Sequence, residues 1–137
     1  MQEKLFASYM DALHRDAAVF CGEMLKEKGI TLGLLYFILY VCSNPGCTPV
    51  QLSRAVGLDR AYTLRCIHKL VEEDCFIRKP HPTDGRATLL YPTPKATEIA
   101  SLSRQMLEDW DAHILSGLSA EEKQLLFRIL EKLQKKG

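Results

Sequence analysis

Residues 48–70 read TPVQLSRAVGLDRAYTLRCIHKL, and this stretch predicts two short helices joined by a tight turn at Gly57. Thr48 is suited to cap the first helix, because Gln51 stands three positions later, where a capping box places Glu or Gln. After the glycine, Asp59 is suited to cap the second helix. Two short helices joined in this way are typical of a helix-turn-helix, a motif that places its second helix in the major groove of DNA.

The second helix of this stretch has two faces of different chemistry. Its apolar positions recur at helical spacing, and they are Leu64, Ile67, Leu70 and Val71. The other face is cationic and hydrogen-bonding, and it carries Arg60, Tyr62, Thr63, Arg65, His68 and Lys69. No carboxylate beyond the capping Asp59 stands on this face. The pattern predicts a helix that packs on one side and faces nucleic acid on the other.

Length and composition fit a single globular domain. The chain has 137 residues, of which 47% are hydrophobic and 26% charged, both ordinary for a soluble protein. The formal net charge is only +1, but residues 48–69 hold four basic side chains against one carboxylate, which favours a phosphate-facing patch. The longest apolar run, residues 34–42, is shorter than the roughly 20 residues of a membrane span, so we expect no membrane contact.

Five cysteines are scattered along the chain, and their odd number without a secretion leader predicts reduced thiols and a cytoplasmic protein. They form no zinc pattern, because the nearby Cys42 and Cys47 are followed by no second close pair of ligands. The sequence also lacks a phosphate loop, a nucleophile elbow and a paired-carboxylate pattern. We therefore expect no metal, no cofactor and no enzymatic activity.

A β-hairpin is predicted directly after the helix-turn-helix. Asp74 stands where a left-handed cap is expected, and strands are predicted over residues 75–79 and 87–91, around a turn rich in Pro, Asp and Gly. A hairpin in this place is a wing. Its tip residues His81 and Arg86 are placed to reach the neighbouring minor groove.

Long helices flank this region. They are predicted over residues 2–28, 32–43 and 94–116, and Ser119 with Glu122 forms a capping box for a final helix. The first helix and the last two are more apolar than a monomer of this size requires, so the simplest arrangement intertwines them with a second copy. A two-fold dimer also places two recognition helices about 34–36 Å apart, one turn of DNA.

The sequence therefore predicts a mainly α fold with a small β-hairpin wing, a winged helix-turn-helix with N- and C-terminal dimerisation helices. Residues 1–137 form a single domain, in which 32–92 are the DNA-binding core and 1–30 and 93–137 are the dimerisation helices. The order of elements, together with particular residues, resembles the MarR family of winged helix-turn-helix transcriptional regulators. The residues that carry this resemblance are Leu52, Ser53, Asp59, Arg60, Ala61, Arg65, Leu70, residues 78–87, Thr93 and residues 117–122.

The wing is the most specific part of the resemblance, because Asp84 and then Arg86 follow a proline-rich turn. The resemblance implies a cytoplasmic homodimer that binds a palindromic operator, usually as a repressor, and is released by a small, often aromatic, ligand or by an oxidant. It also implies that Asp84 holds the shape of the wing while Arg86 reaches DNA. The sequence departs from the family pattern at Asp74 and Ala96, where glycine is usual, and at Gly85, where a second arginine is usual.

The DNA-contacting residues are predicted in two groups. Arginine grips guanine at two points and threonine meets a thymine methyl, so the recognition helix supplies the base- and phosphate-reading set of Arg60, Tyr62, Thr63 and Arg65. Phosphate contacts that fix the register are expected from Thr48, Gln51 and Arg54. The remaining members of the predicted surface are Lys69, His81, Asp84 and Arg86. A plain solvated helix face is the alternative interpretation of the same residues.

A ligand pocket is expected between the dimerisation helices and the winged part, although aromatic stripes at helical spacing are also typical of plain core. The candidate lining residues are Tyr9, Leu13, Phe20, Tyr36, Tyr40 and Trp110. Two further hypotheses remain open. Cys21, with tyrosines further along the chain, makes a thiol-based redox sensor possible, provided that the thiol is exposed and has a lowered pKa. The protein is alternatively a winged-helix interaction module without specific DNA readout.

Overall fold

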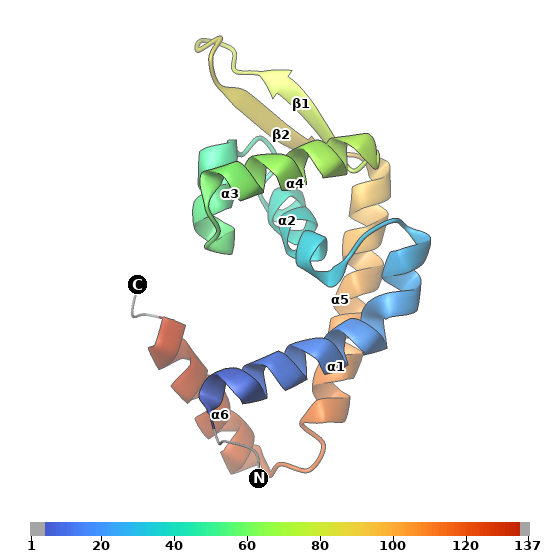
Figure 1. Cartoon of the computed structure of the whole chain (residues 1–137), viewed down its shortest axis with the longest axis vertical. Coiled ribbons are helices and arrows are strands. Elements are labelled where there is room, and N and C mark those ends of the chain that lie inside the picture. Colours follow the sequence, from blue (N-terminus) through green and yellow to red (C-terminus); the bar gives the residue numbers. More distant parts are fainter. Residues whose placement is uncertain (1–4, 135–137) are drawn as a thin grey trace.

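A computed structural model describes residues 5–134, which form helices and one hairpin along a single long axis (Figure 1). The elements in order are α1 (Phe6–Glu27), α2 (Leu32–Ser43), α3 (Pro49–Val56), α4 (Arg60–Glu72), β1 (Phe76–Pro80), β2 (Thr88–Pro92), α5 (Pro94–Ile114) and α6 (Ala120–Gln134). The predicted mainly α fold with a hairpin wing is confirmed. The predicted first helix began at residue 2, and its first three residues lie outside the described residues.

The helix-turn-helix consists of α3 and α4, and its capping residues act as predicted. Thr48 Oγ1 accepts a hydrogen bond from the Gln51 amide (3.2 Å), and the side-chain oxygen of Gln51 accepts one from the Thr48 amide (2.9 Å). Gly57 adopts the left-handed conformation (φ 71°) that the tight turn requires. Asp59 Oδ1 accepts a hydrogen bond from the Tyr62 amide (2.7 Å) and so fixes where α4 begins.

The wing is an antiparallel hairpin that begins one residue later than predicted. Its paired residues run from Phe76 opposite Pro92 to Pro80 opposite Thr88. The delay has a physical cause at the end of α4. Asp74 is left-handed as predicted (φ 59°), and the Cys75 amide donates to the Leu70 carbonyl (2.8 Å), so Cys75 closes the helix instead of starting the strand.

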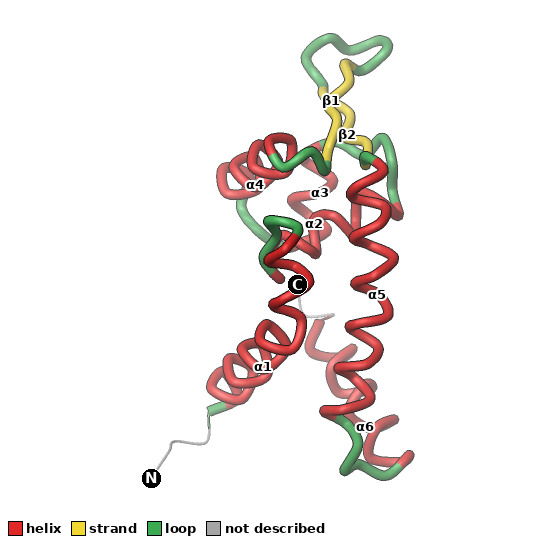
Figure 2. The backbone as a smooth tube through the Cα atoms, turned by 90° about the vertical axis from the view of Figure 1, so that its right-hand side faces the viewer, coloured by secondary structure: helices red, strands yellow, loops and turns green. Residues whose placement is uncertain are grey.

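Thr93 joins the wing to α5. Its buried hydroxyl donates to the carbonyl of Asp74 (2.6 Å) and accepts a hydrogen bond from the Ala96 amide (3.2 Å), which caps α5 as predicted. From this point α5 runs back from the base of the wing and packs against α2 and α1 (Figure 2). The wing is thus anchored directly to the longest helix of the C-terminal half.

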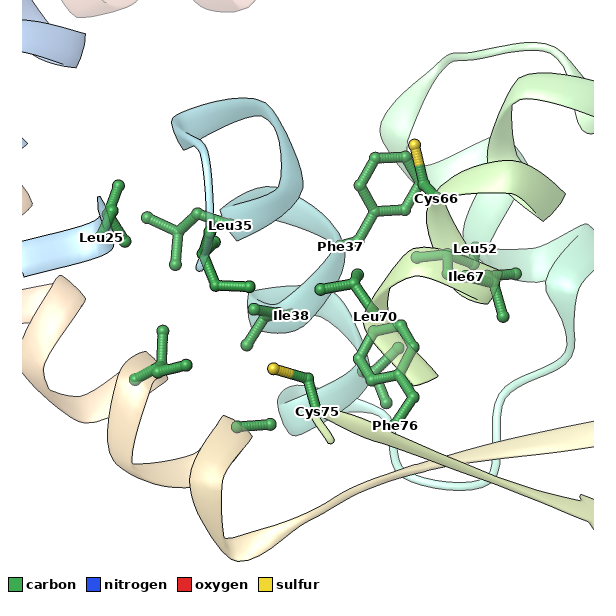
Figure 3. Close-up of a cluster of buried hydrophobic side chains, with 14 of the residues drawn as sticks. Leu25, Leu35, Phe37, Ile38, Leu52, Cys66, Ile67, Leu70, Cys75 and Phe76 are labelled. Carbon is green, nitrogen blue, oxygen red and sulfur yellow. The ribbon is translucent and has the colours of Figure 1, made fainter. Parts of the chain in front are cut away.

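The core surrounds α2, which is apolar on nearly every side. Leu35, Phe37 and Ile38 of α2 are almost fully buried, and they pack among side chains from α1, α4 and the strands (Figure 3). The helix contacts α1, α3, α4, α5 and β2. The prediction that this helix lies beneath the DNA-binding helices is therefore confirmed, and it supports the position of α4 from within.

The two ends of the described chain lie away from this core. Figures 1 and 2 show α6 and the N-terminal half of α1 projecting from the end opposite the wing. None of the residues of α6 is buried, although the helix carries exposed apolar side chains at Leu125, Phe127, Ile129 and Leu133. The first half of α1 likewise exposes Phe6, Tyr9, Met10 and Leu13. These helices leave a large apolar surface without an intramolecular partner in the described part of the chain.

Candidate DNA-binding surface

A groove separates the start of α3 and the start of α4 from the wing. Its volume is about 430 Å³, and it is lined by Thr48, Pro49, Val50, Arg60, Leu64, Asp84, Arg86, Ala87 and Thr88. Four residues predicted to contact DNA, from three different elements, are therefore brought to one place: Thr48, Arg60, Asp84 and Arg86. We refer to these nine residues as the wing groove.

Four of the arginines predicted to contact DNA lie on α3, on α4 and in the wing. Arg54, Arg60, Arg65 and Arg86 are all exposed, and none of them forms an ion pair with another residue between 5 and 134. The guanidinium of Arg65 lies over the Tyr62 ring, 5.5 Å from its centroid, and this cation–π contact favours one orientation of the side chain. The donors of these arginines are thus available to phosphate or base acceptors.

The tip of the wing is held by two of the predicted residues. Asp84 Oδ1 accepts a hydrogen bond from the backbone amide of Arg86 (3.0 Å), which leaves the Arg86 guanidinium free. His81 Nδ1 accepts hydrogen bonds from the amides of Asp84 (3.1 Å) and Thr83 (3.2 Å). The shape-holding role implied for Asp84 therefore has a geometric basis, whereas one ring nitrogen of His81 is engaged within the wing itself.

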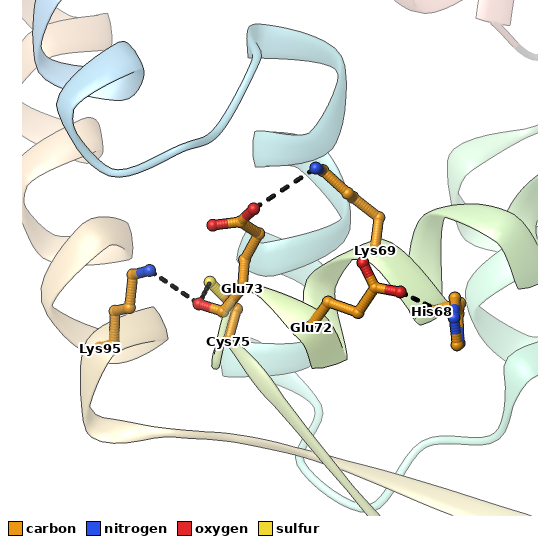
Figure 4. A network of polar contacts seen from close by, with 6 residues as sticks. All are labelled: His68, Lys69, Glu72, Glu73, Cys75 and Lys95. Carbon is orange, nitrogen blue, oxygen red and sulfur yellow. Dashed lines mark hydrogen bonds and ion pairs between the residues drawn. The ribbon is translucent and has the colours of Figure 1, made fainter.

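Lys69 is placed differently from the arginines. Its Nζ lies 3.3 Å from the Glu73 carboxylate, one turn further along the helix (Figure 4). His68 is paired in the same way, with 2.9 Å between Nε2 and the Glu72 carboxylate. Because the Lys69 charge is already partnered, a DNA contact from Lys69 stays a prediction without support from the geometry.

The prediction that Thr63 lies on the DNA-facing side of α4 is wrong. Thr63 is fully buried, while Leu64, predicted as a core position, is 44% exposed. The buried face of α4 is formed by Thr63, Cys66, Ile67 and Leu70. Cys66 packs there as a small apolar side chain, and a helix face that includes Cys66 cannot also include Leu64, which points the opposite way.

Sequence reasoning therefore missed Leu64 as a member of the exposed surface. Residues 63, 66, 67 and 70 follow the i, i+3, i+4, i+7 spacing of a helix face, and this spacing was available in the sequence once Cys66 is counted as apolar. Val50 and Thr88, which also line the wing groove, were not predicted. Their position depends on how α3 and the wing approach each other, for which the sequence contains no local signal.

Two of the predicted ligand-pocket residues line a cavity of the described chain. A cavity of about 420 Å³ between α1, α2 and the α3–α4 turn is lined by His14, Gly33, Tyr36, Phe37, Tyr40, Ala55, Val56 and Leu58. Only Tyr36 and Tyr40 of the six predicted residues belong to this lining. Burial, followed by the nearby Cys21 and Asp111, raises the pKa of the Tyr36 phenol, so it stays a neutral hydrogen-bonding group.

The other four predicted lining residues have different surroundings. Trp110 Nε1 donates a hydrogen bond to the Asp16 carboxylate (2.8 Å), and Phe20 stacks on His113 with 6.1 Å between ring centroids. Both contacts join α1 to α5. Tyr9 and Leu13 are exposed on the N-terminal half of α1. None of these four residues belongs to the lining of the cavity around Tyr36 and Tyr40, and their place in a ligand pocket stays a prediction.

The structure also opposes the redox hypothesis at Cys21. The Cys21 side chain is fully buried, and burial raises the pKa of its thiol. A sensor thiol requires exposure and a lowered pKa, whereas the Cys21 thiol is buried and its pKa is raised. Burial likewise raises the pKa of Cys42, Cys47 and Cys75. The surroundings of Cys21 therefore give no support to the alternative of a redox-sensing thiol, which stays a hypothesis.

Comparison with known proteins gives relatives over almost the whole chain. The HTH-type transcriptional regulator BilQ of Clostridium symbiosum is 37% identical over 133 residues, which are 97% of this chain and 92% of that protein. A MarR protein from Peptoclostridium difficile has a TM-score of 0.88 and 27% identity, covering 98% of this chain and 90% of that chain. A mutant of MarR from E. coli, solved with operator DNA, has a TM-score of 0.81 and 22% identity, covering 93% and 91%.

No family model matches the chain, but these relatives and the fold agree. The chain belongs to the MarR family of winged helix-turn-helix transcriptional regulators, and it is a DNA-binding regulator. Along residues 5–134, no helix is long and apolar enough to cross a bilayer. The same residues contain no group of three or more His, Cys, Asp or Glu side chains placed to hold a metal ion.

Proposed function

We propose that this regulator is a homodimeric repressor that binds a palindromic operator and is released by a small aromatic ligand. The proposal includes no enzymatic activity, and it places the protein in the cytoplasm beside the DNA on which it acts. The observation that carries it is the apolar surface of α6 and the first half of α1. Apolar side chains on helices without a buried residue are typical of an interface, because a monomer gains nothing by exposing them.

A second copy of the chain is the partner that we infer for this surface. Homodimers with two-fold symmetry are the commonest soluble oligomers, and each copy supplies the same patch to the other. A MarR mutant of similar fold was solved with operator DNA. Two recognition helices related by a two-fold axis require two half-sites of inverted sequence, about one DNA turn apart, which is a palindromic operator.

The DNA contacts are assigned by the chemistry of the exposed side chains. We assign base-edge and phosphate contacts to Arg60 and Arg65 on α4, because arginine donates to two guanine acceptors at once. Arg54 on α3 is assigned to phosphate. Arg86 is assigned to the minor groove beside the wing, since its side chain is exposed and its backbone is fixed by Asp84. Thr48 and Gln51 act mainly by beginning α3 through their mutual hydrogen bonds.

The cavity around Tyr36 and Tyr40 is the site that we propose for the ligand. Its volume of about 420 Å³ lies in the range of small-molecule pockets, and its walls are mostly apolar and aromatic. The lining includes His14 from α1 as well as Ala55 and Leu58 beside the helix-turn-helix. A ligand in this cavity therefore contacts a dimerisation helix and the DNA-binding part together. It shifts the repressor toward the arrangement of α1 and the helix-turn-helix that binds the ligand more tightly.

The test begins with selection of bound duplexes from a random DNA pool at fixed salt. We expect an enriched inverted repeat, bound by two copies of the chain. Titration with a panel of aromatic acids should then weaken binding to that duplex, and a Tyr36→Phe variant should respond less to acids that bond to the phenol. Equal, strongly salt-dependent binding to all duplexes would instead favour the alternative of an interaction module without specific readout.

A further inference from the structure

Leu64 is an exposed leucine in the middle of a cationic surface. It lies on α4 one turn after Arg60 and forms part of the wall of the wing groove, which also includes Arg86. Its side chain is 44% exposed, while the neighbouring Thr63 on the same helix is fully buried. A large apolar side chain in this position requires an explanation, because the exposed neighbours Arg60 and Arg65 on the same helix are charged.

Packing within the chain does not provide that explanation. The buried face of α4 consists of Thr63, Cys66, Ile67 and Leu70, and Leu64 belongs neither to this face nor to the core cluster of the described residues. Within the wing groove it shares the lining with two small apolar side chains, Val50 and Ala87. The groove thus combines an apolar patch with two arginines, Arg60 and Arg86, and one carboxylate, Asp84, which is hydrogen-bonded to the Arg86 amide.

Double-stranded DNA offers a matching chemistry on its major-groove edge. Each base pair presents donors and acceptors there, and thymine alone adds an apolar group, its 5-methyl. A surface that places arginines beside a leucine is therefore complementary to phosphates and guanine acceptors beside a thymine methyl. Protein partners would be recognised differently. Arg60 and Arg86 form no ion pair within residues 5–134, and two such arginines beside so small an apolar patch suit a polyanion better than a hydrophobic interface core.

We propose that Leu64 is a specificity-determining residue that packs against the 5-methyl group of one thymine in each operator half-site. The inference rests on the proposed function, because it requires that α4 enters the major groove of a preferred sequence. Arg60 and Arg65, on either side of Leu64 along the helix, fix the register in which the leucine meets that base. The contact discriminates between sequences and adds little to binding of random DNA, since phosphates carry most of the non-specific affinity.

The experiment uses the whole protein and the tightest duplex selected from a random pool. Each thymine of one half-site is replaced in turn by deoxyuridine, which removes the methyl group and leaves the hydrogen bonds of the base pair unchanged. Affinity is measured by fluorescence anisotropy at fixed salt for the wild type, Leu64→Ala and Leu64→Met. The remaining thymines serve as internal controls, and thermal unfolding shows that the three proteins are equally folded.

We expect one thymine whose replacement weakens wild-type binding about fourfold, the value of one buried carbon group. Leu64→Ala should bind both duplexes equally at that position, and Leu64→Met should keep the preference, because Met fills a similar apolar volume. If Leu64→Ala still prefers thymine over deoxyuridine at that position, or if no thymine is sensitive, the assignment of Leu64 is overturned. The proposed function is unaffected by either result. Failure to select any preferred duplex overturns the proposed function as well, so the two failures are distinguishable.

Discussion

The carboxylate of Glu73, at the end of α4, lies directly against the Cα atom of Gly29, in the turn between α1 and α2. A Cβ atom on residue 29 would lie 2.5 Å from Glu73 Oε2. Lys69 Nζ lies 3.3 Å from the same carboxylate, and Lys95 Nζ donates to the Glu73 carbonyl at 2.7 Å (Figure 4). The end of the recognition helix is thus in contact with the end of α1 and the start of α5.

Gly29→Ala should destabilise the protein by about 1–2 kcal/mol. Residue 29 has a positive φ of 75°, which strains alanine, and the new methyl group displaces the Glu73 carboxylate from Lys69. Gly22→Ala, inside α1 and upstream of that turn, is the matched control. A Cβ atom at residue 22 meets nothing within 4 Å, so alanine should stabilise the helix by about 0.5–1 kcal/mol. Thermal and urea unfolding measure both, and changes of the same sign would contradict the account.

Thr63→Val should increase the free energy of unfolding by about 1 kcal/mol without changing operator affinity. The Thr63 hydroxyl is buried and has no hydrogen-bond partner among residues 5–134, so removing it at constant shape relieves a desolvation cost. Denaturant unfolding and an anisotropy titration check the two halves of the prediction. Weaker operator binding by a well-folded Thr63→Val protein would mean that Thr63 contacts DNA after all.

Arg65→Ala and Arg86→Ala should each weaken operator binding by roughly tenfold, because each removes a charge with two or more donors from the DNA-facing surface. If the lost contact is to phosphate, the slope of log affinity against log salt should also decrease by about one. Arg104→Ala on α5 is the matched control, since Arg104 is equally exposed and pairs loosely with Glu108 (3.8 Å). Wild-type affinity in both variants would show that the surface is wrongly assigned.

Phe127→Glu should convert the proposed dimer to a monomer. Phe127 is exposed on α6, so the charge costs little in a single chain but is buried in the proposed pair, where loss of an aromatic contact is expected to weaken association at least 30-fold. Analytical ultracentrifugation over a concentration series measures this. Val19→Glu provides the comparison, because Val19 is 81% exposed on the side of α1 opposite its apolar stripe and should leave the dimer intact.

Hydrogen peroxide should leave operator affinity unchanged near neutral pH. Burial raises the pKa of the Cys21 thiol, so its thiolate fraction at a given pH is lower than that of a free thiol, and the thiolate is the form that reacts. Mass spectrometry after peroxide treatment should find Cys21 unmodified. Oxidised Cys21 together with loss of binding would restore the redox hypothesis.

Local signals were sufficient for most of the fold. The capping box of Thr48 and Gln51, the turn at Gly57 and the Asp59 cap are short-range interactions, and each is present where the sequence predicted it. The prediction of which side of α4 faces the core was wrong, because Thr63 and Leu64 are adjacent and either of them can begin an apolar face. Only packing against α2 decides between them, and packing depends on residues far apart in sequence.

The residue types of the candidate site could be proposed from the sequence, but which of them line one groove could not. Arg60 and Arg86 are separated in sequence by the rest of α4, by β1 and by most of the wing turn, and the left-handed turn at Asp74 and the anchoring of Thr93 bring them to one groove. The pocket prediction stays untested, and Trp110 and Phe20 are aromatic residues of suitable spacing whose partners, Asp16 and His113, hold α1 to α5. Aromatic spacing alone does not distinguish such contacts from a cavity wall.

The lack of any buried residue in α6 has a consequence for how much of this protein a cell must make. A helix that is covered only by a second chain is stabilised by mass action, so in the proposed dimer its folding depends on the total concentration of the protein. The melting temperature should therefore rise on going from dilute to concentrated solution. Dilution would weaken DNA occupancy twice, by separating the pairs and by loosening the helices that align their two recognition helices.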